Sequence, residues 1–378
     1  MEKIKSIYKD RAWIEINMQN LQNNIEEIKK LIPEDCKIMA VVKANAYGHD
    51  MVKVASKLNQ IGIENFAVAT LSEAIELRNQ GIKGDILILG YTDFDDIKYV
   101  QDYNLTQTIV DYSYAKTINE IISKGKIKAH IKLNTGMNRI GESCRNIENI
   151  ESIFKLENID ILGMYTHLSS ADSLESGDID FTNKQIKSFF DCVNEIKKLG
   201  YNPGKIHVQS SYGILNYPEM KCDYVRPGII MYGVYCTKKH NAKVEPSLKP
   251  VLELKARITS VKYIDKGESV SYGRTYIAKE RTKIATVSIG YADGYPRNIS
   301  GKNAKVLLNG KYATVVGRIC MDQLMIDVSD IDDVKEGDIV TLIGTQKEIN
   351  AEEIADKADT ITDELLCRLG LRLPRIEK

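Results

Sequence analysis

The strongest constraint on the fold is an alternation of short β-branched runs with longer amphipathic stretches between residues 37 and 235. Eight of these runs have the pattern of strands: Lys37–Lys43, Phe66–Ala69, Ile86–Leu89, Gln107–Val110, Lys128–Leu133, Ile159–Tyr165, Lys205–Val208 and Tyr224–Arg226. Helical patterns lie between most of them, including a capping box at Thr70-Leu-Ser-Glu73 and the segment Thr182–Leu199. Eight strands alternating with helices predict a (β/α)8 barrel. An open doubly wound sheet is the alternative, but no GxGxxG turn follows the first strand.

Two other parts of the chain do not fit this barrel. The strand-like run Trp13–Ile16 is one strand too many, so it either replaces a weak barrel strand or pairs elsewhere. After Val244, long alternating runs with few helices predict a second, mainly β domain. Within it, Leu308-Asn-Gly-Lys311 has the sequence of a type I′ hairpin. We expect residues 12–240 to form the barrel, and residues 1–11 and 245–378 to form the β domain.

Composition and charge exclude several classes of function. Lys plus Arg equals Asp plus Glu at 52 each, so no net field favours nucleic acid or an anionic membrane. No apolar run approaches the ~20 residues that span a bilayer, and the charged N-terminus does not resemble a signal peptide. The seven cysteines form no CxxC pair, which argues against structural zinc and a disulfide framework. A soluble, reduced, cytoplasmic protein is expected.

Lys43 is the first candidate for chemistry. It ends the run Ile38-Met-Ala-Val-Val-Lys43, and in such barrels the C-terminal strand ends form the active face. A lysine in that position suits Schiff-base chemistry, although a strand-terminal lysine that simply reaches solvent is the commoner case. The following Ala44–His49 segment is predicted to be a tight polar loop that directs a tyrosine hydroxyl and backbone amides at a ligand.

The motif Val42-Lys-Ala-Asn-Ala-Tyr-Gly-His49 resembles the pyridoxal phosphate (PLP) lysine motif of bacterial alanine racemases. Further motifs of that family follow in the expected order over nearly the whole chain. The resemblance implies an N-terminal (β/α)8 barrel plus a C-terminal β domain, with the first strand leaving the barrel to join the β domain. It also implies a PLP-dependent racemase that interconverts L- and D-alanine and supplies D-alanine for peptidoglycan.

Carried over position by position, the resemblance assigns roles to individual residues. Lys43 would carry the cofactor and act as the base on one face of the substrate, and Tyr272, in Ser271-Tyr-Gly273, as the base on the other face. Tyr47 would bind the phosphate. Arg226 would face the pyridine nitrogen, where a permanent cation disfavours protonation of the ring, and His167 would orient Arg226.

The resemblance extends to the rest of the pocket. Ser211, Gly228 and Ile229 would bind phosphate through a hydroxyl and backbone amides. Arg139 would lie near the phenolic oxygen of the cofactor and the substrate carboxylate, steadied by Lys132, which is carbamylated in many members.

Residues of the β domain complete the implied pocket. Tyr291 and Met321 would line the substrate pocket and its entrance. In the family these two residues and Tyr272 are supplied to the lysine of the partner subunit, so the resemblance implies a homodimer with shared active sites. No metal site is expected.

Several positions depart from the family pattern. Gln209-Ser-Ser-Tyr-Gly213 differs from the usual sequence, and it also resembles the racemase domain of the membrane serine/alanine racemases of vancomycin-resistance clusters. Asn138 replaces a usual glycine, Asn134 a usual aspartate, and Leu371 a usual phosphate-contacting tyrosine. A serine or dual serine/alanine racemase is therefore an alternative, because a methyl-sized pocket discriminates poorly against one added hydroxyl.

Other classes share part of this architecture. PLP decarboxylases of basic amino acids and racemases for larger side chains have the same two domains, but the glycine-rich phosphate loop and the cysteine–aspartate pair expected of the decarboxylases are not evident. A PLP carrier or homeostasis protein resembles the barrel alone, and the β domain with its Ser-Tyr-Gly motif argues against it. A purely structural protein would have no reason to combine Lys43, Tyr272, Arg226 and His167 in matching motifs.

Overall fold

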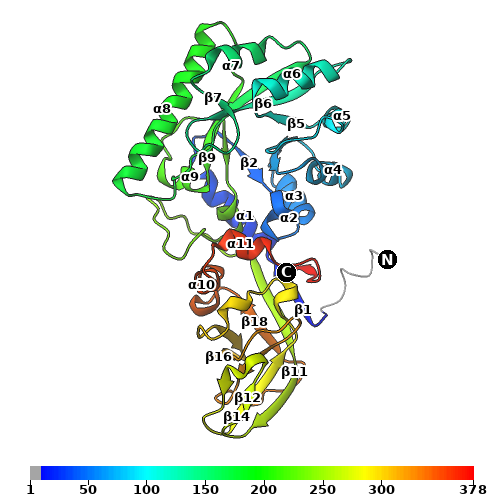
Figure 1. Cartoon of the computed structure of the whole chain (residues 1–378), viewed down its shortest axis with the longest axis vertical. Helices are drawn as coiled ribbons and strands as arrows, with labels where there is room; N and C mark the ends of the chain where they lie inside the picture. The colour runs from blue at the N-terminus through cyan, green and yellow to red at the C-terminus, as the bar shows by residue number, and fades with distance from the viewer. Residues whose placement is uncertain (1–9) are drawn as a thin grey trace.

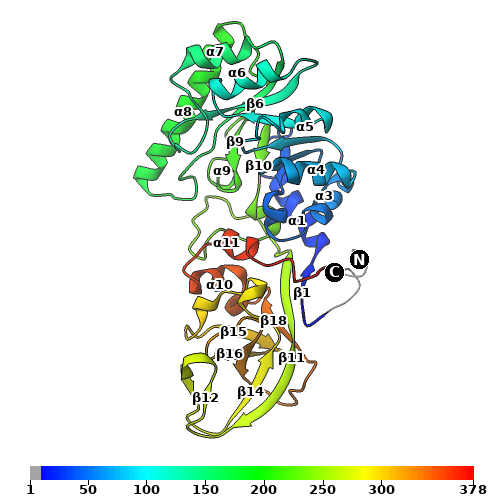
Figure 2. The same cartoon turned by 45° about the vertical axis from the view of Figure 1, so that its right-hand side comes forward.

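The protein has two parts, a barrel surrounded by helices and a smaller mainly β domain (Figures 1 and 2). The computed structural model describes residues 10–378. The expectation for residues 1–9, which were assigned to the β domain, therefore lies outside the described residues.

The barrel has eight parallel strands, as the sequence predicted. They are β2 (Lys37–Val41), β3 (Asn65–Val68), β4 (Asp85–Ile88), β5 (Thr106–Ile109), β6 (Ile127–Asn134), β8 (Ile159–Tyr165), β9 (Lys205–Ser210) and β10 (Tyr224–Arg226). Each pairs with its neighbour along the chain, and β10 pairs with β2 to close the ring. Both faces of these strands are covered, so they are almost continuously buried, including polar residues on β5, β6 and β9. The short strand β7 (Glu142–Ser143) extends β6.

Helices pack outside the barrel or connect its strands. They are α1 (Met18–Lys29), α2 (Lys43–Tyr47), α3 (Met51–Gln60), α4 (Leu71–Asn79), α5 (Ile97–Asp102), α6 (Tyr112–Ile121), α7 (Ile147–Phe154), α8 (Ser176–Lys198), α9 (Ser211–Asn216) and the 3-10 helix η2 (Ile229–Tyr232). The capping box at Thr70 and Glu73 is present at the start of α4. Helix α8 begins at Ser176, earlier than the expected Thr182. The earlier start was missed because the buried residues of the helix begin only at Thr182.

The second domain is built around a closed ring of antiparallel strands. Its strands are β11 (Leu252–Ile264), β14 (Thr282–Val287), β17 (Leu324–Asp327), β16 (Lys311–Val316), β15 (Lys305–Leu308) and β18 (Ile339–Ile343). The β15–β16 turn has positive φ at both Asn309 and Gly310, as the hairpin prediction requires. A small hairpin, β12 (Ser269–Val270) with β13 (Tyr276–Ile277), projects from the ring.

The ninth strand predicted near the N-terminus belongs to this second sheet. Strand β1 (Ala12–Ile16) pairs with β11 and with the C-terminal strand β19 (Arg375–Glu377). Residues 12–16, which were expected to belong to the barrel, therefore belong to the sheet of the β domain. The Trp13 side chain is fully buried there.

The C-terminal helices connect the two parts. Helices α10 (Ala351–Lys357) and α11 (Thr362–Cys367) lie between the barrel and the β strands (Figure 1). Gly48, at the end of α2, packs so closely on α11 that an added β-carbon would stand 2.3 Å from the Leu366 carbonyl oxygen. Arg375 Nε donates to the Gly48 carbonyl at 3.0 Å. These contacts place α11 beside the C-terminal ends of the barrel strands.

Candidate active site

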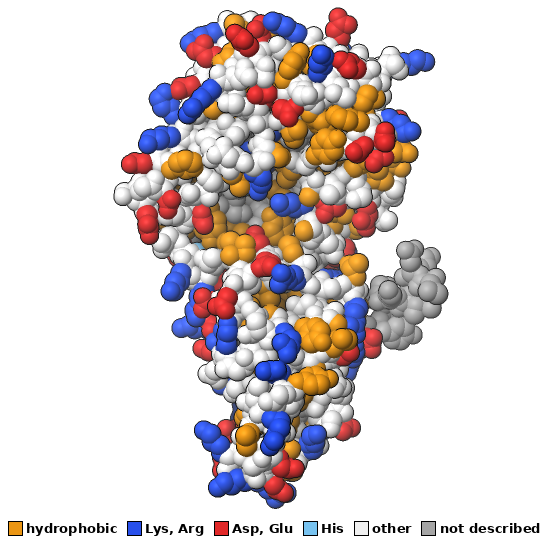
Figure 3. All heavy atoms as spheres, viewed as in Figure 1, with side chains coloured by type: hydrophobic (Ala, Val, Ile, Leu, Met, Phe, Trp, Pro, Cys, Tyr) orange, Lys and Arg blue, Asp and Glu red, His pale blue; other side chains and the backbone are white. Residues whose placement is uncertain are grey.

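The C-terminal ends of the barrel strands surround a cavity of about 610 Å³. Nine residues singled out in the sequence line it: Lys43, Tyr47, Lys132, Arg139, His167, Ser211, Arg226, Gly228 and Ile229. Ile361 and Asp363, at the start of α11, also line it, so the cavity lies where the barrel meets the β domain. The surface is hollowed between the two parts on the face drawn in Figure 3.

Lys43 opens a turn of unusual backbone geometry. The four residues Ala44–Tyr47 have φ between 52° and 54°, which is left-handed helical conformation. This conformation costs roughly 1–2 kcal/mol per non-glycine residue, so the surroundings must hold it. Glu73, the capping-box glutamate of α4, accepts a hydrogen bond from the Ala44 amide at 2.6 Å, and Asn45 accepts one from the Met51 amide at 2.8 Å. The expected tight polar loop is thus a strained turn braced by a neighbouring helix.

Tyr47, Ser211 and Gly228 form a cradle of hydrogen-bonding groups. The Gly228 amide donates to Ser211 Oγ at 3.0 Å. A β-carbon on Gly228 would stand 2.5 Å from the Tyr47 hydroxyl oxygen, so only glycine permits this approach. Ile229 begins η2 immediately after Gly228. Hydroxyls and backbone amides converging at a helix start suit a phosphate group.

Arg226 is a buried cation without a carboxylate partner among the described residues. It is 3% exposed. Its guanidinium donates to the carbonyls of Thr166 at 2.7 Å and Val208 at 3.0 Å, and to His207 Nδ1 at 2.8 Å. His167 Nδ1, which the sequence assigned to orient Arg226, lies farther away at 3.5 Å. Burial lowers the pKa of Arg226 to about 10, which leaves it charged at neutral pH.

Lys132 lies under the same cavity. Its ammonium group donates to the Leu133 carbonyl at 3.1 Å and stands 5.2 Å from the ring centre of Tyr165. Burial lowers the pKa of Lys132 well below its usual value, and the nearby Arg226 and Arg139 lower it further. A lysine in these surroundings has an increased fraction of neutral amine, which is the nucleophilic form.

The turn before Arg139 explains two of the departures from the family pattern. Asn138 has φ 55°, and asparagine tolerates this left-handed region better than most residues. Asn134 Oδ1 accepts hydrogen bonds from the amides of Gly136 and Asn138, both at 3.1 Å, as an aspartate could. Both substitutions are therefore compatible with the turn that carries Arg139 to the cavity.

The β-domain residues of the expected site lie apart from this cavity. Tyr272, Tyr291 and Met321 are 68%, 41% and 54% exposed, and none of them lines the cavity that contains Lys43. Tyr272 begins the 3-10 helix η3 (Tyr272–Arg274), which lies in the loop that connects β12 to β13. Leu371 is 84% exposed and does not line the cavity either. The chain thus brings together the barrel half of the expected site and leaves the β-domain half on the surface.

Three residues that the structure places at the site were given no role from the sequence. His207 contacts Arg226, Glu73 braces the Lys43 turn, and Tyr165 stacks on His207 with ring centres 4.6 Å apart. The alternation of side chains along β9, which directs every second residue into the barrel, could have identified His207. Glu73 could not be found in this way, because its second role depends on a contact with a residue 29 positions away.

In residues 10–378, no group of histidine, cysteine or acidic side chains is arranged to hold a metal ion. Over the same part of the chain, no helix has the length and apolarity to cross a bilayer.

Fold and site together define a two-domain protein with a (β/α)8 barrel, in which a strand-end lysine and a buried arginine share a cavity with a cradle of hydroxyl and amide groups. Residues 16–236 match the family model "Alanine racemase, N-terminal domain", and residues 251–377 match "Alanine racemase, C-terminal domain". The chain belongs to the alanine racemase family, which confirms the resemblance found in the sequence.

Individual relatives agree with this assignment. An amino-acid racemase of Enterococcus faecalis is 43% identical over 98% of this chain and 52% of its own length, so the chain spans about half of that relative. An alanine racemase of Desulforamulus reducens is 42% identical over 97% of this chain and 99% of its own length. The solved structure of alanine racemase from Clostridium difficile 630 superposes with a TM-score of 0.93, at 38% identity over 98% of this chain and 96% of that one.

Proposed function

We propose that this protein is a PLP-dependent amino-acid racemase with alanine as its main substrate. The observation that carries the proposal is the convergence of Lys43, the Tyr47–Ser211–Gly228 cradle and Arg226 on one cavity of about 610 Å³. Its residues fit PLP by their chemistry, because the cradle offers hydroxyl and amide groups to a phosphate and Lys43 offers an amine to an aldehyde. The relatives named alanine racemase support the choice of substrate.

In the proposed reaction two bases act on opposite faces of the substrate. PLP, when bound, supplies an electron sink that lowers the cost of removing the Cα proton. Lys43 Nζ takes that proton from one enantiomer, and Tyr272 of the partner subunit returns a proton to the other face from its phenol oxygen. In the reverse direction the two roles exchange. One proton leaves Cα and one returns, so the substrate is inverted without net gain or loss of protons.

Two arginines prepare the cavity for this reaction. Arg226 presents a permanent cation where the ring nitrogen is expected, which disfavours a protonated ring and so limits how deeply negative charge is withdrawn from Cα. Rapid return of a proton is favoured by this arrangement over decarboxylation or transamination. Arg139 lines the cavity and is suited to the substrate carboxylate.

The exposed β-domain residues support the proposed dimer. Tyr272, Tyr291 and Met321 would complete the cavity of a second copy, and exposed aromatic and methionine side chains are enriched at interfaces. In this arrangement the proposed active site needs two chains. A cytoplasmic location and a supply of D-alanine to peptidoglycan follow from the same proposal.

A serine or dual serine/alanine racemase is the second candidate. Ser210 and Tyr212 both line the cavity, where they add hydroxyl groups to its wall. Leu371, the third departure considered for selectivity, does not line the cavity within this chain. The E. faecalis relatives carry the broader name "Amino-acid racemase", which leaves the substrate open.

Racemisation of L-alanine and L-serine, measured side by side on PLP-loaded protein, tests the proposal. A strong preference for alanine supports a housekeeping alanine racemase. Serine turnover equal to or above alanine turnover moves the enzyme to the serine/alanine group, and Ser210 and Tyr212 become the first residues to mutate. Absence of turnover with either substrate, in protein that binds PLP at Lys43, contradicts both substrate assignments.

A further inference from the structure

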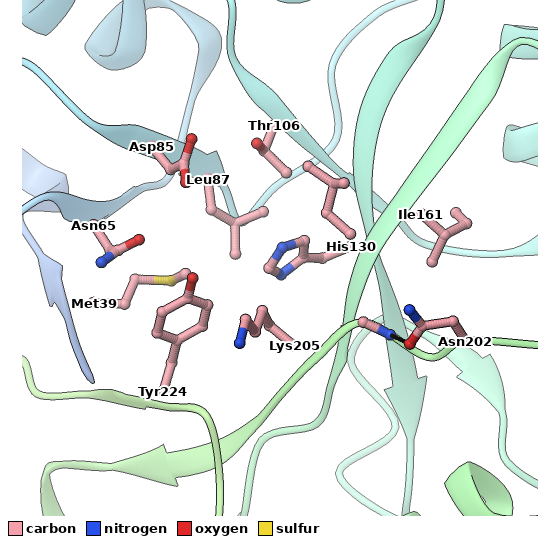
Figure 4. Close-up of a pocket in the computed structure, with 12 residues that line it drawn as sticks. Met39, Asn65, Asp85, Leu87, Thr106, His130, Ile161, Asn202, Lys205 and Tyr224 are labelled. Atoms are coloured by element: carbon pink, nitrogen blue, oxygen red, sulfur yellow. Dashed lines mark hydrogen bonds between the residues drawn. The ribbon is translucent and has the colours of Figure 1, made fainter. Parts of the chain in front are cut away.

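A second cavity of about 430 Å³ opens at the opposite, N-terminal mouth of the barrel. Figure 4 shows side chains from several barrel strands directed into it, with His130 among them. The lining side chains include Met39, Asn65, Asp85, Thr106, His130, Lys205 and Tyr224. His130 is 5% exposed, and its ring fills space that Gly163 leaves free, because a β-carbon there would stand 2.9 Å from His130 Nδ1.

Two short hydrogen bonds connect this cavity to the candidate active site. His130 Nδ1 lies 2.7 Å from His207 Nε2, and His207 Nδ1 lies 2.8 Å from Arg226 Nη1. Tyr165 stacks on the His207 ring with an interplanar angle of 5°, and the Arg226 guanidinium lies 5.2 Å from the Tyr165 ring centre. All four side chains are buried. These two hydrogen bonds form a hydrogen-bond chain, Arg226–His207–His130, that runs through the barrel interior from one mouth to the other.

The positions of the protons along this chain follow from the chemistry of arginine. A guanidinium can only donate, so His207 Nδ1 must accept, and the proton of the neutral His207 ring is on Nε2. His207 Nε2 then donates to His130 Nδ1, which leaves the proton of His130 on its own Nε2. Burial lowers the pKa of both histidines, so both rings are neutral at physiological pH. This arrangement of protons gives each hydrogen bond between Arg226, His207 and His130 one donor and one acceptor.

The opposite arrangement would leave Arg226 poorly held. If His207 carried its proton on Nδ1, an N–H group would face the guanidinium N–H at 2.8 Å. Arg226 would then lose an acceptor while remaining 3% exposed. A buried donor without an acceptor carries its full desolvation penalty. His130 prevents this, because its Nδ1 accepts the Nε2 proton of His207.

We propose that His130 is a positioning residue for the active site, which holds His207 as a hydrogen-bond acceptor and thereby aims Arg226 into the cavity that contains Lys43. The effect on turnover rests on the proposed racemase function. The arrangement of protons in the unliganded protein does not, so the two ideas can fail separately.

Heteronuclear NMR of protein labelled only at histidine provides the direct test. The protein has five histidines, so the spectrum can be assigned with variants that each lack one histidine. Both His130 and His207 are expected to be neutral and protonated on Nε2, in the wild-type protein without any substrate. A His207 ring protonated on Nδ1, or charged at pH 7, overturns the proposal even if racemisation is observed.

Three variants separate positioning from packing. His130→Leu cannot accept a hydrogen bond, and we expect kcat to fall about tenfold, the scale of one buried hydrogen bond left unmade, with KM nearly unchanged. His130→Asn places Oδ1 near the former Nδ1, so it should retain most of kcat. Thr106→Val changes a residue that lines the same cavity but takes no part in the hydrogen-bond chain, so its kcat should equal that of the wild type. Equal losses in His130→Leu and His130→Asn, or a matching loss in Thr106→Val, overturn the proposal.

The nitrogen chemical shifts of His207 report on its hydrogen bonds in these variants. A change in stability alone would not alter these shifts. In His130→Leu the His207 nitrogen shifts should change, whereas in His130→Asn they should remain those of an Nε2-protonated ring. Unchanged His207 shifts in His130→Leu contradict the proposed coupling, whatever its melting temperature.

Discussion

The Tyr47 hydroxyl and the Gly228 α-carbon fit together only because residue 228 lacks a side chain. A β-carbon on Gly228 would stand 2.5 Å from the hydroxyl oxygen and 3.2 Å from the ring carbon that bears it. Ser211 Oγ accepts a hydrogen bond from the Gly228 amide at 3.0 Å. The proposed phosphate cradle is therefore fixed by contacts between three chain segments far apart in sequence.

Gly228→Ala should weaken PLP binding by displacing Tyr47. We expect at least about a tenfold loss of affinity, because a charge-assisted hydrogen bond to phosphate contributes roughly 1.5–3 kcal/mol. Titration of cofactor-free protein with PLP measures the effect. Tyr47→Phe is the matched control, since it removes the hydroxyl without a clash and should lose affinity to a similar or smaller degree. Unchanged affinity in both variants contradicts the cradle.

Lys43→Ala should abolish both the visible absorbance of lysine-bound PLP and racemisation, because it removes the amine proposed to bind the PLP aldehyde and to take the Cα proton. Absorbance spectra and turnover of L-alanine, measured on one preparation, check this. Retention of the absorbance band in the variant would refute the assignment of Lys43. Lys53→Ala, in helix α3 outside the cavity, is the control for general effects of removing a lysine.

Tyr272→Phe and Lys43→Ala should complement each other when the two chains are mixed. In a dimer with shared sites, a hybrid has one doubly defective site and one site with both bases intact. Random exchange makes half of the dimers hybrids, so recovery of about a quarter of wild-type activity is expected. Turnover after co-refolding or co-expression measures it. Two inactive variants that stay inactive when mixed, although hybrids form, would contradict shared sites.

Tyr272→Phe alone should slow proton exchange on one face of the substrate more than on the other. Loss of solvent deuterium incorporation from one enantiomer, with partial retention from the other, is the expected pattern. Equal and mild losses with both enantiomers argue against two bases.

The protein should lose stability as pH falls below about 6.5. Burial lowers the pKa of His49 from 6.5 to about 4, and those of His130, His167 and His207 also fall. Between the unfolded and folded pKa values the unfolded chain binds protons that the folded chain does not, so unfolding is favoured. Each such histidine contributes up to about 1.4 kcal/mol per pH unit.

Urea unfolding of the cofactor-free protein at several pH values measures this slope. His49→Asn is the informative variant, because Asn can still donate to the backbone carbonyls that His49 Nδ1 contacts at 2.9 Å but does not titrate. Its slope should be lower by about 1.4 kcal/mol per pH unit. A slope equal to that of the wild type would show that His49 does not contribute.

Lys132 should take up carbon dioxide as a carbamate. In this step the neutral amine nitrogen forms a bond to the carbon of CO2, a C–O π pair moves onto oxygen, and the nitrogen loses a proton to water. Because burial lowers the pKa of Lys132, the neutral amine is available at moderate pH, and the resulting anion would balance Arg139 and Arg226. Carbon NMR with labelled bicarbonate should show a carbamate signal that is absent in Lys132→Ala and grows as pH rises. A signal of equal strength in the variant would rule out Lys132 as its source.

Much of the fold was predictable because it is written in local patterns. The alternation of strands and helices predicted the barrel, the Asn-Gly turn at 309–310 predicted a hairpin, and the Thr70–Glu73 capping box predicted the start of α4. The start of α8 was not predictable in this way, because its buried residues begin only at Thr182, six residues after the helix starts at Ser176.

The sequence by itself determined the family, because Lys43, Tyr47, Arg139 and Arg226 stand in motifs whose order and spacing identify it. The tertiary structure alone decided how these residues are held. The bracing of the Lys43 turn by Glu73, the approach of Tyr47 to Gly228 and the chain from Arg226 to His130 all join segments distant in sequence. The physical reason is that hydrogen-bond acceptors and close packing depend on distances in space, and those distances exist only after the barrel has closed.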